Sequence, residues 1–184
     1  MEYKMTIAGL ERALPLCKVT DDLYIAAFVI FGDPELTVAA AKELLEKAPE
    51  YDYLITAEAK SIPLIHEMAR QNSNQRYLLA RKYPKLYMQD ILTAKVRSIT
   101  TDKEQVLYLD GNEARLMKDK RILIVDDVIS TGESLHAIEE LVKMAGGNVV
   151  GRMSILAEGD AIDRKDIIYL EKLPLFNADG TVKQ

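Results

Sequence analysis

The chain has 184 residues, of which 48% are hydrophobic and 29% charged, a composition typical of one water-soluble globular domain with a full core. Its formal net charge of -5 excludes general attraction to nucleic acid, and no apolar run approaches the roughly 18 residues that span a membrane. One cysteine, Cys17, excludes an internal disulfide, and the distant His66 and His136 do not suit structural zinc. Since the first residues also lack the apolar core of a signal peptide, we expect a cytoplasmic protein that binds neither membrane nor nucleic acid.

Charge is distributed unevenly along the chain. Between Arg76 and Arg121 there are eleven basic and six acidic residues, although the protein as a whole is acidic. A basic middle segment indicates a local anionic ligand rather than a long polyanion. A solvated basic face would give the same count, so the motifs must decide between the two readings.

Helical and strand patterns alternate from Asp33 onward. The first helix begins with Asp33 as N-cap and Pro34 in the first turn, and Pro49 ends it. Apolar spacing predicts further helices at about 62–70 and 135–145, strands at 53–56, 76–81, 122–125, 149–156 and 167–170, and a two-stranded ribbon at 96–99 and 105–109. Strands separated by helices predict an α/β fold with a parallel sheet, which binds ligands at the carboxyl ends of its strands.

The segment 122–134 carries the strongest functional signal. Four apolar residues form a buried strand, Asp126 and Asp127 follow at its carboxyl end, and a loop of small and hydroxyl residues leads into a helix. Unpaired backbone N–H groups and the helix dipole favour a phosphate at that point. The two carboxylates can accept hydrogen bonds from sugar hydroxyls or hold the water shell of Mg²⁺. The segment therefore predicts a site for a ribose 5-phosphate.

Two other readings of this segment are possible. One is an ordinary buried strand that ends in an acidic turn. The other is a phosphorelay receiver domain, which also has paired acids after a strand, but near its start. Only 57 residues follow Asp127, too few for the rest of such a domain.

The same segment resembles the phosphoribosyl-pyrophosphate (PRPP) motif of the type I phosphoribosyltransferases. The resemblance implies that Asp126 and Asp127 contact the ribose hydroxyls, with any metal contact made through water or ribose. It assigns the 5-phosphate to the loop residues Ser130, Thr131, Gly132, Glu133 and Ser134.

Two upstream segments are similar to the adenine branch of this family. Ala57-Glu58-Ala59-Lys60-Ser61 resembles its pyrophosphate loop, with Lys60 in place of arginine and Ser61 in place of glycine. The stretch 81–86 resembles the start of its flexible loop. The resemblance assigns pyrophosphate binding to Ala59, Lys60, Ser61, Arg81, Lys82 and Lys85.

Two departures from the adenine pattern concern the base and the catalytic group. The Phe-Arg-Asp segment of those enzymes is Tyr24-Ile25-Ala26-Ala27 here, and the loop glutamate aligns with Thr100. Asp102 or Glu104 can substitute for that glutamate only if the loop register shifts, so the catalytic residue is left unassigned.

The resemblance implies one phosphoribosyltransferase domain over residues 1–184, with a flexible loop at about 83–100. Its fold would be a twisted, mainly parallel sheet flanked by helices, with a small hood from the terminal segments. The implied activity is Mg²⁺-dependent transfer of 5-phosphoribosyl from PRPP to a nucleobase, preferably a purine, by a homodimer. The alternative is a regulatory protein of the same fold that binds PRPP or a nucleotide without turnover.

Overall fold

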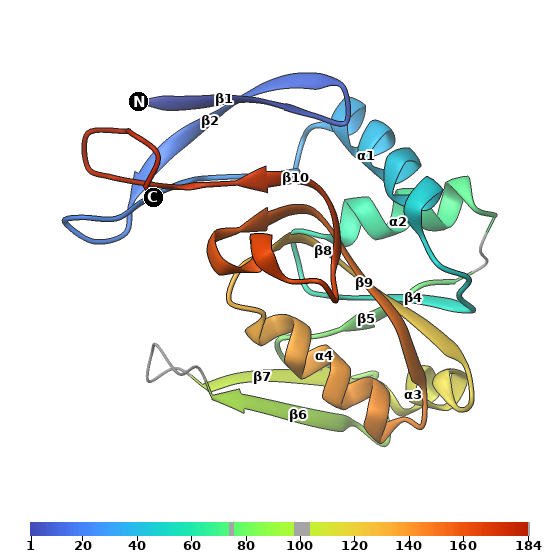
Figure 1. Cartoon of the computed structure of the whole chain (residues 1–184). Coiled ribbons are helices and arrows are strands. Elements are labelled where there is room, and N and C mark those ends of the chain that lie inside the picture. The colour runs from blue at the N-terminus through green and yellow to red at the C-terminus, as the bar shows by residue number, and fades with distance from the viewer. Residues whose placement is uncertain (74–75, 98–103, 184) are drawn as a thin grey trace.

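The computed structural model describes residues 1–73, 76–97 and 104–183. Figure 1 shows a central sheet with helices on both faces and a separate small sheet near the two termini. Within the described residues, no helix combines the length and the apolar character needed to cross a membrane.

The central sheet has five parallel strands in the order β10-β9-β8-β4-β5. Their bounds are β10 Ile168–Leu173, β9 Asn148–Glu158, β8 Arg121–Ile129, β4 Tyr53–Ala57 and β5 Leu78–Ala80. The parallel sheet predicted from the alternating pattern is confirmed, and all carboxyl ends of these strands lie at one edge.

The two faces of β8 pack against different halves of the core. Leu123 and Val125 belong to the hydrophobic cluster that contains the buried faces of α1 and α2. Ile122 and Ile124 alternate with them and belong to the cluster formed with α3 and α4. This alternation is the period-two pattern of a strand buried on both sides, and it places β8 at the centre of the molecule.

Two of the described helices, α1 and α3, begin at an aspartate whose side chain caps the first turn. In α1 (Pro34–Lys47), the Asp33 carboxylate accepts a hydrogen bond from Leu36 N at 3.0 Å, as predicted for an N-cap. Among the described residues, three more α-helices follow, α2 at Ile62–Gln71, α3 at Gly111–Met117 and α4 at Glu133–Met144, and a short 3-10 helix spans Gly159–Asp163.

The terminal segments form the hood that the family resemblance predicted. β1 (Glu2–Ile7), β2 (Leu10–Lys18), β3 (Tyr24–Ala26) and β11 (Leu175–Phe176) pair in the order β1-β2-β3-β11, every pair antiparallel. Buried hood residues share one cluster with α1 and α2, so the hood packs on that side of the sheet (Figure 1).

The predicted ribbon is present with an earlier start. β6 (Leu92–Arg97) pairs antiparallel with β7 (Glu104–Leu109), and residues 98–103 lie outside the description. β6 therefore occupies part of the segment 83–100 that we expected as a loop. Arg81 forms a bridge with Tyr108, which joins this hairpin to the end of β5.

Candidate functional site

The paired aspartates lie within β8 and not after it. β4 pairs with β8 only as far as Ile124, whereas β9 stays paired with β8 through Ile129. Asp126 and Asp127 therefore stand just beyond the last residue that β8 pairs with β4. The sequence placed the end of the strand at Val125, because two charged residues break an apolar run. The strand continues because its partner β9 continues.

Ser61 connects the predicted pyrophosphate loop to the acidic pair. Its Oγ donates to Asp126 Oδ1 at 2.6 Å, lies 3.2 Å from Asp127 Oδ1, and accepts from Asp127 N at 2.8 Å. Ser61 is the N-cap residue of α2, yet its hydroxyl makes no capping hydrogen bond. The hydroxyl therefore serves the acids, and two segments 65 residues apart in sequence meet at one side chain.

The acidic pair has one cationic neighbour in the same loop. Lys60 Nζ lies 3.0 Å from Asp127 Oδ2, and the Asp127 side chain is buried. Burial raises the pKa of Asp126, and the nearby charge of Asp127 raises it further. A ligand that brings hydroxyl donors or a cation to this point would therefore stabilise the ionised pair.

The predicted phosphate loop lines a cavity of about 150 Å³ at the start of α4. All five loop residues assigned from the sequence are in its lining, together with Asp126 and apolar neighbours from β8 and α4. Gly132 is the N-cap residue with φ of 80°, a left-handed conformation that glycine adopts readily, and its carbonyl accepts from His136 N at 2.9 Å. We call this concave loop, residues 130–134, the cradle.

The predicted basic residues gather around Glu58. Arg81 Nη1 donates to Glu58 Oε1 at 2.9 Å, and Lys82 N donates to Glu58 Oε2 at 3.0 Å. Burial alone would raise the pKa of Glu58, but these hydrogen bonds and the charges of Arg81 and Lys85 outweigh it and lower the pKa. The structure thus brings Arg81, Lys82 and Lys85 to the loop that holds Ala59 and Lys60.

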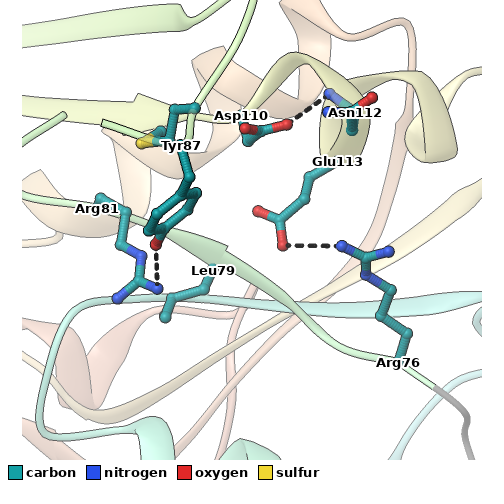
Figure 2. Close-up of a pocket in the computed structure, with 8 residues that line it drawn as sticks. Arg76, Leu79, Arg81, Tyr87, Asp110, Asn112 and Glu113 are labelled. Atoms are coloured by element: carbon teal, nitrogen blue, oxygen red, sulfur yellow. Dashed lines mark hydrogen bonds and ion pairs between the residues drawn. The ribbon is translucent and has the colours of Figure 1, made fainter. Parts of the chain in front are cut away.

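A second cavity, of about 240 Å³, opens beside β5 (Figure 2). Arg81 lines it and donates to Tyr87 OH at 2.8 Å, while Glu113 from α3 faces Arg76 at 3.8 Å. Burial raises the pKa of Glu113. Because Arg81 contacts Glu58 with one nitrogen and Tyr87 with another, this cavity adjoins the pyrophosphate-loop segment.

The two catalytic candidates from the sequence cannot be placed at the site. Asp102 lies outside the described residues, and Glu104 is the first residue of β7, with a side chain that is not described. Both assignments stay predictions.

The acidic pair fits magnesium in the indirect way that the sequence predicts. Mg²⁺ prefers oxygen ligands, keeps several waters and is commonly held through one or two carboxylates plus a substrate phosphate. Among the residues described, no group of three or more His, Cys, Asp or Glu side chains forms a ready metal cluster. The two carboxylates suit an ion that arrives with its ligand.

Sequence reasoning missed three charged residues near this edge. Glu58 was read only as part of a motif, although it holds Arg81 and Lys82. Glu158 ends β9, where burial raises its pKa and the charge of Lys60 lowers it. Arg164 follows the 3-10 helix and approaches Gly132. The one signal in the sequence is the position of Glu158, two residues after the predicted strand 149–156.

Fold and site together define an α/β protein whose parallel sheet carries an acidic pair, a loop with Lys60, and a concave loop at the start of α4 along its carboxyl edge. Residues 34–178 match the family model described as phosphoribosyl transferase domain. The chain therefore belongs to the phosphoribosyltransferase family.

Similar proteins differ in the base that their names specify. An orotate phosphoribosyltransferase from Caldanaerobacter subterraneus is 28% identical over 79% of this chain, a match that spans 63% of that relative's length. A hypoxanthine/guanine phosphoribosyltransferase from Methanococcus voltae is 31% identical, covering 83% of this chain and 78% of the relative. The crystal structure of adenine phosphoribosyltransferase from Rhodothermus marinus has a TM-score of 0.67 at 22% identity, with 94% of both chains covered, and confirms the fold.

Proposed function

We propose that this protein is a Mg²⁺-dependent phosphoribosyltransferase that transfers 5-phosphoribosyl from PRPP to a nucleobase and releases pyrophosphate. The observation that carries the proposal is the contact of Ser61 with both aspartates, 65 and 66 residues away, beside the cradle. That arrangement puts hydrogen-bond acceptors for a ribose next to backbone donors for a phosphate. Membership of the phosphoribosyltransferase family supports the same reaction.

Different residues of the site bind different parts of PRPP. Asp126 and Asp127 accept hydrogen bonds from the ribose hydroxyls, and the cradle binds the 5-phosphate. Lys60, Arg81, Lys82 and Lys85 face the pyrophosphate, assisted by backbone groups at Ala59 and Ser61. Mg²⁺, when bound, neutralises part of the pyrophosphate charge.

Catalysis would come from positioning and electrostatics. The bond between ribose C1 and the pyrophosphate oxygen breaks, and its electron pair leaves with pyrophosphate. A ring nitrogen of the base supplies the electron pair of the new bond to C1, and the base releases its ring N–H proton to solvent. Fixed positive charges around the leaving group stabilise that departure more than they stabilise bound PRPP. We propose a purine as the acceptor, in keeping with the hypoxanthine/guanine relative and with the adenine-type sequence motifs.

Release of pyrophosphate tests the enzyme against the regulatory alternative. Purified protein with Mg²⁺ and PRPP is offered each common nucleobase in turn, and PRPP binding is measured in parallel by calorimetry. Base-dependent pyrophosphate release supports the transferase. Binding of PRPP without release for any base would favour the regulatory protein, and absence of binding would contradict both.

A paired substitution tests the role of the aspartates. Asp126→Asn with Asp127→Asn is expected to weaken PRPP binding at least tenfold, because amides are poorer acceptors and do not retain Mg²⁺. The control is Asp21→Asn with Asp22→Asn, an exposed adjacent pair in the hood with the same change of charge. Equal PRPP affinity of the two double variants would contradict the ribose assignment.

We also propose that the protein forms a homodimer through the segment after Arg81. Tyr83, Leu86 and Tyr87 are large apolar side chains that are 72%, 108% and 64% exposed, an unusual concentration on a single surface segment. Sedimentation of the wild type should give a dimer, and Leu86→Asp should shift it to monomer. Val19→Asp, at an exposed apolar position in the hood, is the control. A monomeric wild type would contradict the proposal.

A further inference from the structure

The cradle lacks a positive side chain in its own lining. Of the nine described residues that line it, none is basic and two, Asp126 and Glu133, are acidic. A sugar phosphate carries up to two negative charges at neutral pH. Backbone donors at the start of α4 offset part of this charge, and a fixed cation close by would offset much more.

Arg164 is the cation that approaches the cradle. Its Nη1 atom lies 2.7 Å from the point that a Cβ on Gly132 would occupy. Any side chain at position 132 would therefore collide with the guanidinium. The absence of a side chain at Gly132 leaves room for the guanidinium beside this residue of the cradle, although Arg164 is not among the residues that line the cavity.

The orientation of Arg164 is fixed by a two-pronged ion pair. Its Nε donates to Asp166 Oδ1 at 2.9 Å and its Nη2 to Asp166 Oδ2 at 2.6 Å. This pair uses one edge of the guanidinium, and Nη1 is the nitrogen nearest to Gly132. The planar fork thus has two of its nitrogens on Asp166 and leaves Nη1 outside that pair.

A chain of ion pairs ties this arginine to α4. Arg152 on β9 pairs with Glu139 on α4 and lies 3.9 Å from Asp166. The loop before β10 and the helix that begins at the cradle are therefore joined by side chains of alternating charge. Arg152 belongs to the same group of charges but has no contact with Gly132.

We propose that Arg164 is a phosphate-binding residue of this site, which supplies the positive charge for the 5-phosphate from outside the cradle sequence. The inference rests on the proposed function, because it assumes that a ribose 5-phosphate group occupies the cradle. Arg164 stays paired with Asp166 and presents Nη1 to the phosphate oxygens. The Arg164 side chain thus favours binding of a phosphorylated sugar over binding of the free sugar.

Ligand dissection by calorimetry tests this role. Binding of ribose 5-phosphate and of Mg²⁺-pyrophosphate is measured for the wild type, Arg164→Gln and Arg152→Gln. Arg164→Gln is expected to weaken ribose 5-phosphate binding at least tenfold and to leave pyrophosphate binding within about twofold, since one charge-assisted contact is lost at one subsite only. Arg152→Gln removes the same charge from the same group of ion pairs and should change both affinities by less than about twofold.

Further outcomes separate the possible explanations. Arg164→Lys should recover part of the lost affinity, because it keeps the charge without the two-pronged grip on Asp166. Equal losses in Arg164→Gln and Arg152→Gln would show a merely structural network and overturn the inference, as would unchanged affinity in Arg164→Gln. A wild type that binds neither ribose 5-phosphate nor PRPP would instead overturn the proposed function.

Discussion

At the scale of single residues, Ser61 joins two motifs that the sequence presents separately. Ser61 is 1% exposed. Its hydroxyl donates a hydrogen bond to the Asp126 carboxylate and accepts one from the backbone N–H of Asp127. A serine at the start of a helix normally caps that helix. Here the hydroxyl contacts the acids, so its effect on stability should depend on them.

Ser61→Ala is therefore expected to lower the free energy of unfolding by about 1.5–3 kcal/mol, the range for a hydrogen bond to a charged partner. Chemical denaturation of Ser61→Ala, Asp126→Asn and the double variant measures the coupling. We expect a coupling energy of about 1 kcal/mol or more between the two positions. Additive effects would mean that Ser61 acts through the helix and not through Asp126.

At the scale of elements, β8 shows what the sequence predicted and what it did not. The buried strand and the helix that follows it were predicted from a single segment and are confirmed, but the acidic pair lies within the strand and not after it. The end of the strand was wrong by four residues, because pairing with β9 rather than local composition decides where β8 stops. Likewise, the approach of Arg164 to Gly132 depends on how two distant loops pack, which no local pattern encodes.

The buried face of each predicted helix follows from its apolar spacing, and α4 provides a test. Leu141 lies fully buried on the inner face of α4, and Met144 is 55% exposed near its end. Leu141→Ala should cost about 2–5 kcal/mol through lost burial and a cavity, whereas Met144→Ala should change stability by less than about 0.5 kcal/mol. Thermal unfolding of both variants checks the assigned faces, and similar losses in both would contradict them.

In α2, an ion pair gives the stability a defined pH dependence. Arg70 donates two hydrogen bonds to Glu67, which lower the pKa of that carboxylate to about 2. A carboxylate with a lowered folded-state pKa stabilises the protein above its unfolded pKa of 4.5, and this contribution is lost as the pH falls toward 2.

Glu67→Gln should therefore reduce the free energy of unfolding by about 1 kcal/mol at pH 7, a modest value because Arg70 is largely exposed. The difference from wild type should shrink between pH 4.5 and about 2, as Glu67 becomes protonated in the wild type. Urea denaturation at several pH values measures it, with the exposed Glu46→Gln on α1 as control. A difference that is independent of pH would contradict the assigned pair.

At the scale of the whole molecule, the hood and the sheet share a hydrophobic core. Ile7 and Phe176 from the hood belong to the same buried cluster as Leu123 from the central strand. The family motifs in the sequence predicted a hood. They did not predict that hood and sheet share one core, because the contacting residues lie far apart in the chain. Because one hydrophobic core spans both sheets, we expect the hood and the central sheet to unfold together.

Phe176 offers the sharpest test of this cooperativity. Its ring is 1% exposed and lies 4.9 Å from the ring of Tyr3, so it connects the last strand to the first. Phe176→Ala should cost about 3–5 kcal/mol and lower the melting temperature of the entire protein. Calorimetry should show one transition for both wild type and variant, with equal van't Hoff and calorimetric enthalpies. Phe31→Ala, at a half-exposed aromatic, should leave the transition nearly unchanged. If hood and sheet share one core, the loss of a single hood side chain lowers the stability of the central sheet as well. Two separate transitions in the Phe176 variant would instead show that the hood folds as an independent unit.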